Sequence, residues 1–232
     1  MKPPAWSFSA LKNFLGCPSK YYKTKITKEF TEVWSADTEF GDEFHKCAEN
    51  YLKHGDKAPL PEKFAQWRAY LDRWRKLAQV PGAALYIEHE MALDFKLRPS
   101  TWFGRQVWSR AKTDVLVVDD TWAYAGDHKT GKSKKYEEQI DQLMITALHV
   151  FYWFPKVHTV RCGYYWLKEN ARAEENTYYR KDIQKMWLIV MPHLKEFKRA
   201  FNEENFPPRS SGLCAGWCPV TSCEFWRPKK DK

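Results

Sequence analysis

The chain has 232 residues and a mass of 27.6 kDa, enough for one substantial hydrophobic core or for one domain with an appendage. Hydrophobic residues make up 44% of it and aromatic residues 16%, a composition that excludes an intrinsically disordered chain. No apolar run approaches the roughly 20 residues of a membrane-spanning helix, and residues 1–20 lack the apolar stretch of a signal peptide. We therefore expect a cytoplasmic protein with no membrane partner.

The charge balance favours an anionic partner. Lys and Arg number 38 against 29 Asp and Glu, which gives a net charge of +9. Such an excess attracts polyanions such as nucleic acid, although a generically basic surface would give the same count. The six cysteines of a protein in a reducing compartment are expected to be free or metal-bound rather than paired in disulfides.

The first part of the chain, residues 1–83, is predicted to be helical. A short helix follows Ser7 or Ser9 as N-cap, and a second covers about 37–53. A third begins near Pro61 and ends before Pro81-Gly82. Each of the two longer helices repeats apolar residues at helical spacing, so each is expected to bury one face.

Residues 84–204 then predict a mixed core. Apolar alternation favours strands over 84–95, 102–110, 113–118, 121–129 and 157–167, a short strand at 178–180, and helices over 136–154 and 182–204. Residues 205–232 are loop-like and contain three cysteines. This order predicts a single layered domain over 1–232, of the α/β (α+β) class, with a central sheet flanked by helices.

One stretch, GDHKTGKS at 126–133, fits two phosphate chemistries. Its spacing satisfies the phosphate-binding P-loop of nucleotide hydrolases, and it also contains Asp127 and Lys129, half of a metal-dependent nuclease site. Two physical points count against the P-loop. Asp127 would place a carboxylate inside a nest meant for anions. The connection 119–121 is also too short for a parallel crossover, so it predicts an antiparallel hairpin.

The predicted hairpin assembles a nuclease-like set of side chains. Asp127 and Lys129 share one face of their strand, and a turn at Asp120-Thr121 places Asp114 opposite Asp127. Carboxylates hold Mg²⁺ or Mn²⁺ while leaving room for a phosphate oxygen, and a lysine can offset charge in the transition state. The alternative is a surface ion pair at the start of a strand, worth roughly 0–1 kcal/mol.

TDVLVV and GDHKTGK, with the residues around them, resemble the PD-(D/E)XK nuclease superfamily. The similarity is to the branch of RecB nuclease domains and the iron–sulfur exonucleases of CRISPR adaptation, including phage-encoded relatives. It implies a restriction-endonuclease-like core with a central mixed sheet, and host cytoplasm as the location if the chain is phage-encoded. It also implies roles for individual residues: His45, Asp114 and Asp127 as metal ligands, Lys129 as the catalytic lysine, and Gln142 as the glutamine of a Q-x-x-x-Y motif that contacts DNA. Here Thr146 stands in place of that tyrosine, and Gln142 could also be an ordinary polar helix position.

The cysteines near the C-terminus form a second motif. Cys214, Cys218 and Cys223 have the spacing C-x₃-C-x₄-C, and soft thiolates suit either Zn²⁺ or an iron–sulfur cluster. The resemblance implies that Cys17 is the fourth ligand of a [4Fe–4S] cluster, joining the C-terminal tail to the N-terminus; relatives more often have C-x₂-C at the last two positions. Zn²⁺ and unliganded thiols remain as alternatives, while Cys47 and Cys162 fit core positions.

Together these features predict a metal-dependent DNA exonuclease of recombination, repair or DNA-end processing. The partner would be single-stranded DNA or duplex ends, with Lys132, Lys134 and Lys135 near the backbone phosphates. A homo-oligomer or a recombination or replication partner is compatible with the sequence. The alternatives are a catalytically silent iron–sulfur module that binds DNA or acts as a scaffold, and a P-loop NTPase.

Overall fold

The computed structural model describes residues 1–32, 36–131 and 140–229. The chain divides into two compact units, one formed by Ser35–Met186 and the other by Met1–Trp34 together with Trp187–Lys232. Among the described residues, no helix is both long and apolar enough to cross a membrane.

The unit Ser35–Met186 is built on a mixed sheet with the strand order β3-β2-β4-β5-β6-β7. Only β5 and β6 pair in parallel, and the other neighbours along this path are antiparallel. The strands are β2 (Ala84–Asp94), β3 (Pro99–Ser100), β4 (Val107–Val118), β5 (Trp122–Lys129), β6 (Thr159–Trp166) and β7 (Arg172–Tyr179). The predicted fold class, an α/β layered core with a central mixed sheet, is therefore confirmed.

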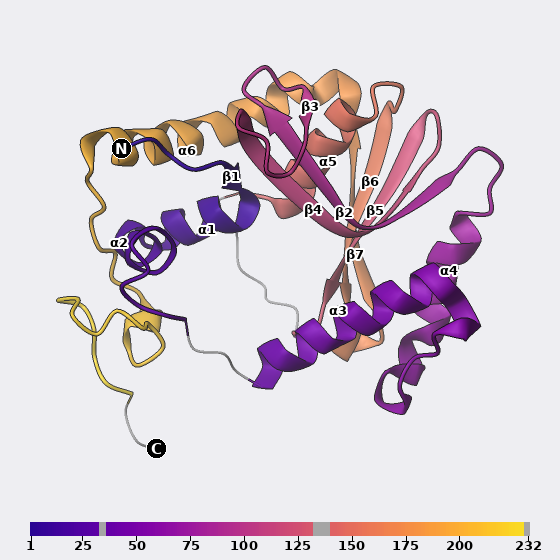
Figure 1. Cartoon of the computed structure of the whole chain (residues 1–232), viewed down its shortest axis with the longest axis horizontal. Coiled ribbons are helices and arrows are strands. Elements are labelled where there is room, and N and C mark those ends of the chain that lie inside the picture. The colour runs from indigo at the N-terminus through magenta and orange to yellow at the C-terminus, as the bar shows by residue number, and fades with distance from the viewer. Residues whose placement is uncertain (33–35, 132–139, 230–232) are drawn as a thin grey trace. The chain divides into compact units, whose positions relative to one another are not determined.

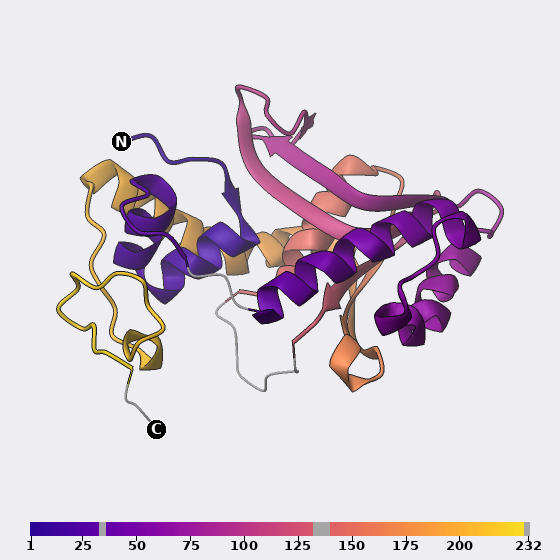
Figure 2. The same cartoon turned by 60° about the horizontal axis from the view of Figure 1, so that its bottom comes forward.

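Helices cover both faces of this sheet (Figure 1, Figure 2). On one face lie α3 (Ala36–His54), the 3₁₀ segment η3 (Glu62–Trp67) and α4 (Arg68–Leu77); the short 3₁₀ turn η2 (Gly55–Lys57) follows α3. On the other face lies α5 (Gln142–Trp153), which makes the crossover that the parallel pair β5–β6 requires. Residues 143–151 of α5 are all buried, as expected for a helix between a sheet and other elements.

The core explains why β4 has a continuous apolar end. Val115 and Val117 pack with the aromatic side chains of α3, η3 and α4, among them Phe44 and Trp67. Leu116 points to the opposite face because side chains alternate along a strand, and it is also fully buried. A strand covered on both faces has no polar face to show in its sequence.

The other unit joins the two ends of the chain. It contains β1 (Trp6–Ser7), α1 (Phe8–Gly16), α2 (Pro18–Tyr21), a π-helical turn η1 (Tyr22–Ile26), α6 (Ile183–Glu203) from Trp187 onward, and a tail with one 3₁₀ turn, η6 (Gly212–Cys214). Phe197 of α6 packs edge-on against Phe14 and Tyr21, with ring centroids 5.1 and 5.7 Å away. Tyr22 stacks on Phe206, with ring centroids 4.3 Å apart.

Several element boundaries differ from the sequence-based prediction. The strands expected at 102–110 and 113–118 are one strand, β4, because residues 107–112 continue the pairing with β2. The short strand expected at 178–180 is the eight-residue β7, an edge strand whose mostly exposed polar residues conceal it in the sequence. The third helix begins with 3₁₀ turns. The helix expected at 136–154 is α5, which begins at Gln142 after the N-cap Asp141; residues 136–139 lie outside the described residues.

Candidate active site

The β4–β5 hairpin sets the frame of the site. Its strands pair antiparallel from Val115 opposite Gly126 to Val118 opposite Ala123, and residues 119–121 connect them. This is the predicted register, and continuing it by one residue brings Asp114 beside Asp127. The antiparallel connection is also the geometry that argued against a P-loop.

Asp127, Lys129 and Gln142 form a connected group where β5 ends and α5 begins. Lys129 Nζ lies 2.6 Å from Asp127 Oδ2 and donates to Gln142 Oε1 at 3.1 Å. Gln142 Nε2 in turn donates to Asp127 Oδ1 at 2.7 Å. Asp141 caps α5 by accepting from the amide of Leu143 at 2.9 Å, so the helix start holds Gln142 in place. Lys129 also lies over the ring of Tyr164, 4.9 Å from its centroid.

Asp114 and His45 meet on the side of the sheet that α3 covers. His45 Nδ1 lies 3.5 Å from Asp114 Oδ1, and Asp114 Oδ2 accepts from the backbone amide of His128 at 2.6 Å. Only 16% of the Asp114 side chain is exposed. The structure therefore places His45 next to Asp114, as a shared metal site requires.

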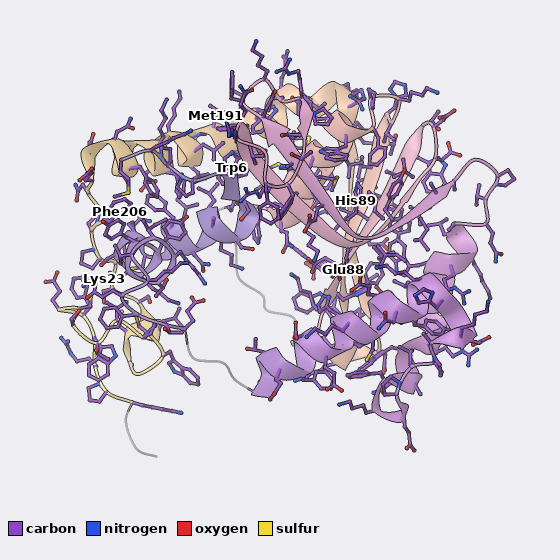
Figure 3. The ribbon with its side chains drawn as sticks, viewed as in Figure 1. Trp6, Lys23, Glu88, His89, Met191 and Phe206 are labelled. Atoms are coloured by element: carbon purple, nitrogen blue, oxygen red, sulfur yellow. The ribbon has the colours of Figure 1, made fainter. Side chains whose placement is uncertain are left out.

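Glu88 is a further member of this group that the sequence did not reveal. It lies on β2 facing α3 (Figure 3), with Oε1 3.8 Å from His45 Nδ1 and Oε2 2.6 Å from Lys112 Nζ. Its backbone has a φ of 51°, in the left-handed region, and the β2–β4 pairing is interrupted at this residue. Neither the left-handed backbone of Glu88 nor its contacts with His45 and Lys112 can be recognised in the sequence.

His128 is the middle residue of Asp-His-Lys, and because side chains alternate along a strand it faces away from Asp127 and Lys129. This orientation brings it to Asp114, with His128 Nδ1 3.9 Å from Asp114 Oδ2. His45, Asp114 and His128 each offer one ligand atom within 4.8 Å of the others, the only such group of His, Cys, Asp and Glu found among the described residues. The alternation of side chains along β5 predicts which face His128 occupies, but it does not predict which residues of other elements lie on that face.

The titratable groups show a strong mutual influence. Burial lowers the pKa of His45, but the carboxylates of Glu88, Asp114 and Asp127 outweigh it and raise that pKa above the ordinary value. Burial, and then the charge of Asp127, raise the pKa of Asp114. Burial lowers the pKa of His128 to about 3, so its imidazole is neutral at physiological pH.

These shifts describe a site suited to a cation. The charge of Asp127 opposes the ionisation of the buried Asp114, and a divalent ion would relieve that repulsion. The carboxylate donors are ones that Mg²⁺ or Mn²⁺ accepts, and imidazole is a common ligand of divalent transition metals. The residues present therefore fit a divalent cation.

The four cysteines predicted as cluster ligands all belong to the unit that contains both chain ends. All six cysteines are free, and these four are half-buried. Cys17 Sγ accepts from the amides of Lys20 and Arg209, both at 3.4 Å, and Cys214 Sγ lies 4.0 Å from the Arg209 carbonyl. Arg209 thus lies between Cys17 and Cys214. The described residues do not gather three of the sulfurs into a closed site for a single ion.

Comparison with known proteins gives the family. The model of the PD-(D/E)XK nuclease superfamily matches residues 5–223, nearly the whole chain. The chain belongs to the PD-(D/E)XK nuclease superfamily. Asp127-His128-Lys129 has the (D/E)XK spacing of the superfamily's name. Lys132, Lys134 and Lys135, expected near DNA phosphates, lie outside the described residues.

Solved structures resemble this nuclease at low sequence identity. One is named "Putative exonuclease", from Eubacterium rectale, with a TM-score of 0.53, 13% identity, and coverage of 98% of this chain and 90% of that one. Another is SSO0001, with a TM-score of 0.49, 14% identity, and coverage of 97% and 88%. The first similarity supports the fold. No curated protein matches the sequence.

Proposed function

We propose that this nuclease is a metal-dependent DNA exonuclease of the RecB-like branch, acting in recombination, repair or DNA-end processing. The support is the register of the β4–β5 hairpin, which brings Asp114 and Asp127 to neighbouring positions. His45 contacts Asp114, and Lys129 and Gln142 contact Asp127. A binding module has no need of buried carboxylates at a surface that meets phosphates. The net charge of +9 supports a polyanionic substrate.

Each side chain has a physical role in this proposal. His45, Asp114 and Asp127 would hold the cation, which polarises the phosphodiester and lowers the pKa of a bound water. Lys129 can orient that water or offset charge that develops on the phosphate. Gln142 is hydrogen-bonded to both Asp127 and Lys129, so it would hold the carboxylate and the ammonium group in fixed positions relative to each other.

A degradation assay tests the activity. The full chain is incubated with end-labelled linear DNA and with circular single-stranded DNA, each with Mg²⁺ or Mn²⁺. We expect linear DNA to be degraded and circular DNA to survive, because an exonuclease needs an end. Lys129→Met and Asp127→Asn should lose about 10²–10⁴-fold in rate, the usual worth of such groups. Their matched controls are Lys156→Met and Asp120→Asn, two exposed residues that pair at 3.4 Å in the same unit.

The outcomes separate the alternatives. Cleavage of circular DNA would make the protein an endonuclease. DNA binding without cleavage by the wild type would favour a catalytically silent module. Cleavage that Lys129→Met and Asp127→Asn leave unchanged would remove the site from the proposal.

We also propose that Cys17, Cys214, Cys218 and Cys223 bind a [4Fe–4S] cluster, with Zn²⁺ as the alternative. The support is their soft thiolate chemistry and the amide groups already directed at two of the sulfurs, since such hydrogen bonds accompany cluster ligands. Residues 205–229 contain no helix beyond one 3₁₀ turn, and bound metal would hold such a segment.

A further inference from the structure

His128 is buried beside the metal site, yet its ring has no polar partner. The residue is 4% exposed, and neither ring nitrogen has a hydrogen-bond partner among the described residues. Its ring meets Phe44 and Tyr70 edge-on, with centroids 5.6 and 5.4 Å away. Buried polar groups in native proteins almost always have a partner, so an imidazole with two open nitrogens requires an explanation.

The position of His128 supplies one. Asp114 Oδ2 is 3.9 Å from His128 Nδ1, and Asp114 Oδ1 is 3.5 Å from His45 Nδ1. Two ligands bonded to one ion at roughly 2.0–2.2 Å are at most about 4.4 Å apart. The donor atoms of His45, Asp114 and His128 lie within 4.8 Å of one another, so small side-chain movements would bring them onto one cation. The backbone amide of His128 also donates to Asp114, which fixes the carboxylate next to the ring.

We propose that the imidazole of His128 is a metal ligand, joining His45 and Asp114, and that it makes the site prefer Mn²⁺ to Mg²⁺. This inference rests on the proposed function because it concerns the same metal site. Asp127, the remaining proposed ligand, contacts Lys129 and Gln142, and His128 adds a second imidazole to the set.

The preference follows from ligand chemistry. Mg²⁺ is a hard ion that takes oxygen ligands and keeps several waters, whereas imidazole nitrogen suits transition metals. A second imidazole therefore adds affinity for Mn²⁺ and adds little for Mg²⁺. A site with His45 alone would discriminate less between the two ions.

Binding is measured by calorimetry on the full chain, without DNA and without a histidine tag. Mn²⁺ and Mg²⁺ are the probes, because softer ions would also bind the cysteines. His128→Phe keeps an aromatic ring in the pocket and removes both nitrogens; His128→Leu is the second variant if the first fails to fold. We expect the Mn²⁺ affinity to fall by at least the roughly 10- to 100-fold that loss of an outer-shell partner costs, with Mg²⁺ affinity nearly unchanged. The exposed His54, changed to Phe, is the matched control.

A spectroscopic measurement identifies the ligand directly. Pulsed electron paramagnetic resonance detects the nitrogen of an imidazole bound to Mn²⁺. In His45→Asn the nitrogen signal should persist through His128, and it should vanish in His45→Asn combined with His128→Phe. If His45→Asn no longer binds Mn²⁺, the test rests on calorimetry of His128→Phe, in which the loss of affinity should be larger for Mn²⁺ than for Mg²⁺.

Other outcomes overturn the inference. A water bridging His128 and the unpartnered Tyr70 hydroxyl would satisfy the same ring and leave Mn²⁺ affinity unchanged in folded His128→Phe or His128→Leu. Equal losses for Mn²⁺ and Mg²⁺ would show that His128 only supports the fold of the site. Mn²⁺ selectivity in a protein that cuts no DNA would sustain this inference while refuting the proposed function.

Discussion

Glu88 adopts a left-handed backbone conformation within a strand, which costs a residue with a side chain roughly 1–2 kcal/mol. Such strain persists where the side chain is held in place, and here Lys112 and His45 hold the carboxylate. The two ion contacts also lower the pKa of Glu88 against the effect of burial, which alone would raise it. The backbone strain at Glu88 therefore lowers the stability of the fold, while its carboxylate places a negative charge beside His45.

Two substitutions at Glu88 separate strain from charge. Glu88→Gln keeps the strain and removes the charge, while Glu88→Gly removes both. We expect Glu88→Gly to be more stable than Glu88→Gln by about 1 kcal/mol in urea unfolding, and both to have reduced nuclease activity. Equal stability of the two variants would show that the backbone conformation carries no cost.

His149 makes stability depend on pH. Its buried ring contacts the Ile145 carbonyl at 2.8 Å and Ser109 Oγ at 3.1 Å, and burial lowers its pKa from 6.5 to about 4. Because the folded-state pKa lies below the unfolded value, the neutral ring contributes stability above pH 6.5 that is lost as pH falls toward 4.

The test is the difference in unfolding free energy between the wild type and His149→Gln. We expect that difference to shrink as pH falls from 6.5 to 4, by an amount on the order of 1–3 kcal/mol. His54→Gln, at an exposed position, should show no such trend. A difference that is constant over this range would contradict the assignment.

The sequence predicted those site residues that lie close together along the chain, and it did not predict contacts between distant elements. Asp114, Asp127 and Lys129 follow from a three-residue connection and strand alternation, which the structure reproduces. Glu88 and the contact of His128 with His45 join residues on different elements, and no spacing rule brings them together. The strain at Glu88 likewise arises only from tertiary structure.

At the scale of elements, the hairpin is held against α4 by a close packing contact. A Cβ on Gly126 would lie 2.5 Å from Trp74 Cζ2 and 2.9 Å from Val115 Cγ1. Glycine at this position therefore lets the indole of α4 lie directly on β5, one residue before Asp127. The same local reasoning from sequence found β5 but missed the extent of β7, because an edge strand rich in charged residues lacks the apolar alternation that marks a strand.

Gly126→Ala should overpack this contact. We expect a loss of about 1–3 kcal/mol in unfolding free energy, and a fall in nuclease rate because a shift of β5 displaces Asp127 and Lys129 together. Gly131→Ala is the control, since nothing lies within 4 Å of its added Cβ. If Gly126→Ala unfolds at the same urea concentration as the wild type, Trp74 does not pack here as described.

At the scale of the whole molecule, the two ends of the chain are held in one unit by Arg209. Its guanidinium donates to the Leu15 carbonyl at 2.5 Å and lies 2.6 Å from Glu196, while its backbone joins Cys17 and Cys214. These contacts link residues almost the full length of the chain apart. The sequence indicated the connection only through the cysteine spacing and a family resemblance, since nothing local to 205–232 predicts which segment it meets.

The proposed cluster predicts a visible colour and a protected tail. Protein purified without oxygen should absorb broadly in the visible range. Cys214→Ser should lose this absorption and much of the protection of residues 205–229 against proteolysis, because metal ligation fixes a segment with little secondary structure. Cys47→Ser, a change within the other unit, should keep both properties. Metal analysis separates the two cofactors, since bound Zn²⁺ would leave the protein colourless but equally sensitive to Cys214→Ser. A colourless wild type without iron or zinc, whose tail is as protected as that of Cys214→Ser, would show that the thiols bind no metal. The chain ends would then be held together by contacts such as those of Arg209 and Phe197.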